Sequence, residues 1–166
     1  MKIWIGGGVA HGKSTFAKKL AKETGWALLD LDSIIFKDNC GNRHLESETE
    51  MKLREFIKNN QNWIIEGAQK RTFCFQGISK ADIIIIIKLN KFMALGRFFL
   101  RQLKTMIKWE HQRGNWRTKI NWIWNYERDD FPRYMELAKK YSKPTIILKS
   151  NQDIDKCISR LKQAVF

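Results

Sequence analysis

Short apolar runs alternate with longer amphipathic stretches along nearly the whole chain. The apolar runs have the length of strands and cover residues 2–5, 26–29, 63–65, 83–87 and 144–148. Between most of them, apolar residues recur every three or four positions, which predicts helices over residues 14–24, 48–59, 91–109, 118–141 and 153–165. Strands that alternate with helices favour an α/β fold, a three-layer α/β/α sandwich around a five-stranded parallel sheet.

The predicted helix over residues 91–109 has two distinct faces. Its basic face is either an ordinary solvated surface or a contact for phosphate, and carries Arg97, Arg101, Lys104 and Lys108. Its apolar face carries Phe92, Leu95, Phe99, Leu103, Met106 and Ile107. We therefore expect the second set to pack against the protein.

The predicted helix over residues 118–141 is rich in aromatic side chains. Such side chains usually form core, although they are also able to stack on nucleobases. The spacing of Ile120, Ile123 and Trp124 predicts one buried face. Pro132 predicts a kink or a fresh helix start. We expect Asn151 or Asp153 to cap the helix that closes the chain.

A glycine-rich loop joins the first predicted strand to the first predicted helix. Its pattern, G-x-x-x-x-G-K-[ST], is that of a loop whose backbone N–H groups surround a phosphate. Lys13 would add a positive charge on the terminal phosphates of a nucleotide, and the Ser14 hydroxyl would bind Mg²⁺. The alternative is a glycine turn that happens to precede a helix. The predicted nucleotide-binding residues are Gly7, Gly8, Val9, Ala10, His11, Gly12, Lys13, Ser14 and Thr15.

His11 within this loop has two interpretations. The imidazole is able to reach the γ-phosphate or to titrate near neutral pH. The simpler expectation is a histidine that points outward from the loop.

Carboxylates follow two of the other predicted strands. Asp30 and Asp32 come after the second strand, and Glu66 ends the third. Ligands of open α/β sheets bind beyond the carboxyl ends of the strands, so these groups are expected at the site. Glu66 is the predicted support for Mg²⁺. Asp32 is either the base that accepts a proton from an attacking hydroxyl or a carboxylate of the metal shell or loop cap.

Charge and length limit the functional classes. The chain of 166 residues has a net charge of +14, and the segment 88–119 holds nine basic residues against Glu110 alone. That surplus attracts phosphate-bearing partners, so DNA or RNA is a possible partner beside nucleotides. No apolar stretch is long enough to span a membrane and no signal segment is evident, so we expect one cytoplasmic domain over residues 1–166 with no membrane partner.

Several motifs together resemble those of the bacterial DNA topology modulation proteins, which belong to the adenylate-kinase-like branch of P-loop proteins. The matching segments are Gly7 to Thr15, Leu31-Asp32, Trp63 to Gly67 with Lys70-Arg71-Thr72, Trp122 to Tyr126, and residues 146–150. The resemblance implies a fold of nucleoside-monophosphate-kinase type that binds ATP and Mg²⁺, with a helical lid over about 91–141 between strands four and five. It also implies substrate contacts at Glu66, Gly67 and Arg71, and lid arginines at Arg113, Arg117 and Arg128.

These observations predict an ATP-dependent kinase that moves the γ-phosphoryl group to a nucleoside, nucleotide or similar small acceptor. The predicted catalytic residues are Lys13, Asp32, Arg113 and Arg117, and the predicted Mg²⁺ ligands are Ser14 and Glu66. The alternative is a nucleic-acid-associated ATPase or regulator that affects DNA topology, in which the loop acts as a switch.

Overall fold

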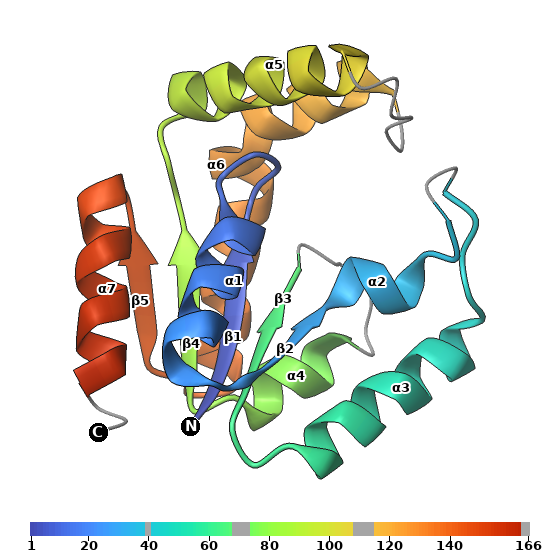
Figure 1. Ribbon diagram of the computed structural model, residues 1–166, viewed down its shortest axis with the longest axis vertical. Coiled ribbons are helices and arrows are strands. Elements are labelled where there is room, and N and C mark those ends of the chain that lie inside the picture. Colours follow the sequence, from blue (N-terminus) through green and yellow to red (C-terminus); the bar gives the residue numbers. More distant parts are fainter. Residues whose placement is uncertain (39–40, 68–73, 108–114, 164–166) are drawn as a thin grey trace.

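The computed structural model describes residues 1–38, 41–67, 74–107 and 115–163. Within these ranges, strands and helices alternate as the hydrophobic pattern predicts (Figure 1). The strands are β1 Lys2–Gly7, β2 Ala27–Asp30, β3 Trp63–Glu66, β4 Ile83–Ile87 and β5 Thr145–Leu148. The helices are α1 Lys13–Thr24, α2 Leu31–Ile35, α3 Glu46–Asn59, α4 Phe75–Lys80, α5 Lys91–Ile107, α6 Trp116–Lys140 and α7 Asn151–Gln163.

The five strands form one parallel sheet in the order β2-β3-β1-β4-β5. Strand β1 is central, with Ile5 opposite Glu66 of β3 on one side and Ile85 of β4 on the other. The chain leaves β1 toward one edge of the sheet and later returns to build the other edge. The crevice beyond the carboxyl end of β1 is therefore the switch point at which such sheets bind ligands.

Helices cover both faces of the sheet, which confirms the predicted α/β/α sandwich. Alternate residues of β4 show the division: Ile84 and Ile86 join the core under α2, α3, α4 and α6, whereas Ile85 and Ile87 join the core under α1 and α7. A strand buried on both faces needs apolar side chains at every position. This explains the five consecutive isoleucines.

Helices α5 and α6 lie between β4 and β5 in the sequence, where the lid is expected. Figure 1 shows α5 across the upper end of the molecule, near the loop that joins β1 to α1. A third apolar cluster joins Ala94 and Phe98 of α5 to Ile123 of α6, with Val9 and Ala10 of the loop packed against it. Helices α5 and α6 therefore pack directly on the glycine-rich loop.

Two expectations about buried faces are wrong. Phe92, Phe99, Leu103 and Ile107 are exposed, because α5 packs instead through Ala94 and Phe98, on the other side of the helix. Trp124 is also half exposed, because α6 turns Ile123 and Tyr126 inward, while Ile120 is only partly buried.

Smaller differences concern helix ends and short helices. A single helix, α6, runs through Pro132, so there is no fresh start at this proline. Helix α7 is capped by Ser150, whose hydroxyl oxygen accepts the N–H of Asp153 at 3.1 Å while the Asp153 carboxylate accepts the N–H of Ser150 at 2.9 Å. Helices α2 and α4 were not expected from the pattern, because each is shorter than two turns.

Candidate nucleotide-binding site

The glycine-rich loop turns tightly between β1 and α1. Gly12 has φ 89°, in the left-handed region that favours glycine, and its carbonyl oxygen accepts the N–H of Phe16 at 2.9 Å as α1 begins. The loop places the N-terminus of a twelve-residue helix at the carboxyl end of the central strand. Backbone N–H groups at such a helix end attract anions, phosphate included.

Lys13 is the charged group at the centre of this arrangement. Its Nζ donates to the carbonyl oxygen of Gly8 at 2.9 Å. Burial lowers the pKa of Lys13, and the negative charges of Glu66, Asp32 and Asp30 act in the opposite direction. The ammonium group therefore lies in the electrostatic field of three carboxylates that come from the ends of β2 and β3 and from the start of α2.

Glu66 and Ser14 form the pair at which a metal is expected. Glu66 is buried, and its burial raises the pKa of the carboxyl, although the hydrogen bond from Ser14 and the charge of Lys13 partly oppose the rise. No three His, Cys, Asp or Glu side chains among the described residues are grouped closely enough to enclose a metal.

Asp30 and Asp32 have different structural roles. The Asp30 carboxylate accepts the N–H of Asp32 at 2.9 Å and so caps helix α2. Burial raises the pKa of Asp30. Asp32 lies exposed in the first turn of α2, and its two alternatives, a base or a carboxylate of the metal shell or loop cap, stay predictions.

His11 does not point outward, as the simpler expectation held. Only 1% of its surface is exposed, because the imidazole lies between the end of β4 and helix α6. Its Nδ1–H donates to the carbonyl oxygen of Ile87 at 3.0 Å, and its ring meets Tyr126 edge-on. Burial lowers its pKa to about 4, so the imidazole is neutral at physiological pH.

Gly8 lies where the loop is most closely covered by α6. A Cβ atom at this position would lie 2.9 Å from Cδ2 of Tyr126 and 3.1 Å from Nε2 of His11. Only glycine fits there without displacing these two rings, so the helix and the loop hold each other in place.

Two arginines of α5 approach the site, and both belong to the basic face for which the sequence left open a solvated surface or a contact for phosphate. The Nη1 group of Arg97 donates to the carbonyl oxygen of His11 at 3.4 Å, and its Nη2 donates to Asn151 of α7 at 2.6 Å. Arg101 is close enough to lower the pKa of Lys13, and burial lowers the pKa of Arg101 itself. The sequence showed the basic face of this helix. It did not show which groups that face contacts, because this depends on the rotation of the helix about its axis.

The remaining predicted site residues include two that fall outside the described ranges. Arg71 and Arg113 fall outside the described residues. Arg117 lies exposed in the first turn of α6, with its guanidinium over the ring of Trp116. Arg128 is exposed and pairs with Asp129 at 2.7 Å. Val9 and Ala10 lie in the loop and Thr15 in the first turn of α1. Gly67 follows Glu66, and its N–H donates to the carbonyl oxygen of Ile5.

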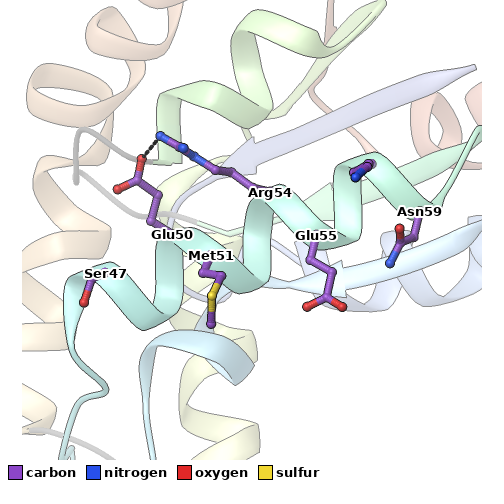
Figure 2. Close-up of a pocket in the computed structure, with 7 residues that line it drawn as sticks. Ser47, Glu50, Met51, Arg54, Glu55 and Asn59 are labelled. Carbon is purple, nitrogen blue, oxygen red and sulfur yellow. Dashed lines mark hydrogen bonds and ion pairs between the residues drawn. The ribbon is translucent and has the colours of Figure 1, made fainter.

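A separate surface pocket lies along the outer side of α3 (Figure 2). Figure 2 shows Glu50 and Arg54 joined by an ion pair, whose atoms are 2.6 Å apart. All of its lining residues belong to this one helix, namely Ser47, Glu50, Met51, Arg54, Glu55, Lys58 and Asn59. It includes none of the groups that converge on Lys13.

Comparisons with known proteins identify the fold. No family model and no curated protein matches the sequence. Among solved structures, the chain is similar to a shikimate kinase from Acinetobacter baumannii in complex with shikimate, with a TM-score of 0.60 and 16% identity over 99% of this chain and 92% of that one. It is also similar to a shikimate kinase from Bacteroides thetaiotaomicron, with a TM-score of 0.57 and 12% identity over 99% and 98% of the two chains. The fold is that of the P-loop NTPases.

Proposed function

We propose that this protein is an ATP-dependent phosphotransferase that phosphorylates a small molecule. The observation that carries the proposal is the position of Lys13, buried at the start of α1 and facing Glu66, Asp32 and Asp30. A phosphate-binding loop, a cation and carboxylates at one sheet edge are the groups that phosphoryl transfer requires. The fold shared with two shikimate kinases supports the small-molecule class of acceptor.

In this proposal the loop residues Gly7 to Thr15 bind the phosphates of ATP. Lys13 neutralises the terminal phosphates, and Arg97 and Arg101 of the lid add positive charge near the loop. ATP bound with Mg²⁺ supplies the phosphoryl group: the bond from the γ-phosphorus to the β–γ bridging oxygen breaks, and a bond to an acceptor oxygen forms. Ser14 and Glu66 would hold the metal.

The acceptor is expected beside α2 and the end of β3. Asp32 is exposed there and is able to take the proton of an acceptor hydroxyl. Glu66, Gly67 and Arg71 would complete the acceptor site, with Arg113 and Arg117 as candidates for the transferring phosphate. In this proposal residues 1–166 form a single domain, and the helical segment over about 91–141 acts as its lid.

The test is ATP turnover with Mg²⁺ in the presence of nucleosides, nucleoside monophosphates, shikimate or DNA, with Lys13→Ala as the blank. We expect turnover that depends on Lys13 and on one small acceptor, with a phosphorylated product. Glu66→Gln should raise the Mg²⁺ concentration needed for half-maximal turnover. Asp32→Asn and Arg71→Ala should remove phosphorylation while ATP still binds.

The resemblance to DNA topology modulation proteins and the net charge of +14 make a nucleic-acid-associated ATPase the competing outcome. Turnover stimulated by DNA alone, without a phosphorylated small product, would replace the kinase proposal. DNA binding through the phosphate backbone would also weaken steeply with salt. The proposed kinase activity on a small acceptor does not require this salt-dependent binding to DNA.

A further inference from the structure

Helix α5 presents an apolar face to solvent. Its exposed side chains include Phe92, with 65% of its surface accessible, and Ile107, with 79%. The opposite side of the helix packs through Ala94 and Phe98 onto the glycine-rich loop and α6. The exposed set, called here the α5 apolar face, consists of Phe92, Met93, Phe99, Leu100, Leu103 and Ile107.

The α5 apolar face is continuous rather than a scatter of single residues. Positions 92, 96, 99, 103 and 107 follow one another by three or four residues, and position 96 is an exposed glycine. The edge of Trp124 on α6 meets Phe92, with ring centroids 6.2 Å apart, and extends the face. A run of this length at helical spacing is far more than the isolated apolar residues that an ordinary surface carries.

The charges beside this face have one sign. The sequence of α5 contains Lys91, Arg97, Arg101 and Lys104 and no acidic residue. Lys104 is exposed next to the α5 apolar face, and the segment 88–119 has a net charge of +8. An amphipathic helix with Phe, Leu and Ile on one side and Lys and Arg beside them is typical of helices that lie in a membrane interface.

We propose that the α5 apolar face binds to the surface of an anionic lipid bilayer. The apolar side chains would enter the boundary between headgroups and acyl chains, while Lys104 faces the lipid phosphates. The described helices include none that is long and apolar enough to cross a membrane. Adsorption at the interface needs no spanning segment, so this proposal differs from the sequence-based expectation of no membrane partner.

Other occupants fit these residues less well. A second copy of the chain would bring another +14 charge and another basic α5 within the range of electrostatic repulsion. A nucleic acid would pair with the cations but offers little to Leu100, Leu103 and Ile107, which neither form hydrogen bonds nor stack on bases. An anionic bilayer complements both the charge and the apolar side chains.

The test is flotation of the full chain with vesicles of phosphatidylcholine alone or of phosphatidylcholine mixed with phosphatidylglycerol. We expect binding to the mixed vesicles only, weakened by added salt. Leu103→Asp or Phe99→Asp should lower the partition coefficient at least about tenfold, since each removes an apolar side chain from the interface. Lys13→Ala should bind as the wild type does, which separates this proposal from the kinase proposal.

The matched control is Met51→Asp, which makes the same change of charge at an exposed apolar residue of α3. It should change the partition coefficient less than about twofold. Equal effects of Leu103→Asp and Met51→Asp would overturn the proposal, because general charge attraction would then explain the binding. A dimer or a DNA complex that Leu103→Asp disrupts, with no binding to vesicles, would also overturn it.

Discussion

The imidazole of His11 lies edge-on against the ring of Tyr126, with ring centroids 4.4 Å apart and an interplanar angle of 74°. This contact joins the glycine-rich loop to helix α6, while Arg97 joins the same residue to α5. A loop residue that commonly points away from the core is therefore held by three elements, counting Ile87 at the end of β4.

The first prediction concerns the pH dependence of stability. Burial, with smaller contributions from Lys13 and Arg97, depresses the pKa of His11 from 6.5 to about 4, against the opposing effects of the Ile87 carbonyl and Glu127. The unfolded chain then takes up the proton first. The stability that depends on neutral His11 is fully present above about pH 6.5 and is lost as the pH falls to about 4, an effect of about 3 kcal/mol.

His11→Asn tests this prediction, because asparagine is able to donate to the Ile87 carbonyl but does not titrate. Urea denaturation at pH 7 and at pH 4.5 should show a smaller loss of unfolding free energy for the variant than for the wild type. His44→Asn, which changes a partly exposed histidine paired with Glu48, is the control. An equally steep loss in wild type and His11→Asn would contradict the buried neutral imidazole.

Two glycines at the ends of α1 give a matched pair of variants. Gly12 and Gly25 have φ 89° and 72°, so alanine at either should lower the unfolding free energy by about 1–2 kcal/mol. Only at Gly12 would the added Cβ meet another group, lying 2.8 Å from Nη1 of Arg97. We therefore expect Gly12→Ala, and not Gly25→Ala, to weaken ATP binding measured by calorimetry. Equal weakening by both would show that the loop contact with Arg97 is unimportant.

Substitutions of Asp30 and Asp32 are expected to have different effects, the first on stability and the second on catalysis. Asp30→Ala removes the cap of α2 and should lower the unfolding free energy by about 1 kcal/mol. Asp32→Asn should leave the unfolding free energy nearly unchanged and remove acceptor phosphorylation. Urea denaturation and product formation measure the two effects. If Asp32→Asn keeps full transfer activity, Asp32 is not the base.

Adjacent phenylalanines test how α5 is turned. Phe98 is fully buried, whereas 49% of Phe99 is exposed. Phe98→Ala should cost about 3 kcal/mol of unfolding free energy, because it leaves a cavity against Ile123 and the loop. Phe99→Ala should cost less than about 1 kcal/mol. Thermal or urea denaturation of both variants measures the two losses of unfolding free energy. A larger loss for Phe99→Ala than for Phe98→Ala would mean that the helix packs through its other face.

The fold was largely readable from the sequence because its strands are buried on both sides. Runs such as Ile83 to Ile87 therefore contain apolar residues without interruption. The turn of the glycine-rich loop into α1 was equally readable, since Gly12, Lys13 and Ser14 are neighbours in the chain, while phosphate binding by this loop stays a prediction. Glu66 and Asp30 could be placed near the loop because parallel strands end at a common edge.

The orientation of side chains was harder to predict, for physical reasons that differ between sites. Periodicity identified α5 but assigned its apolar face to the core, whereas the helix packs on the loop through Ala94 and Phe98, with Arg97 donating to the carbonyl oxygen of His11. The orientation of His11 depends on a loop in which Ala10 has φ 60°, a conformation that the local sequence pattern does not predict. Such contacts join residues that are far apart in the chain, so the sequence around either residue does not predict them.

The central place of β1 determines when the site forms during synthesis. Strand β1 pairs with β3 and β4. The middle of the sheet therefore cannot form until Trp63, the partner of Lys2, and Ile85, the partner of Ile5, have been synthesised. His11 likewise needs the carbonyl of Ile87. Such long-range pairings slow folding, since the loop closure is costly. A ribosome must therefore complete at least half of the 166 residues before the glycine-rich loop reaches its native shape. Until then the loop is an open segment that proteases and chaperones can reach.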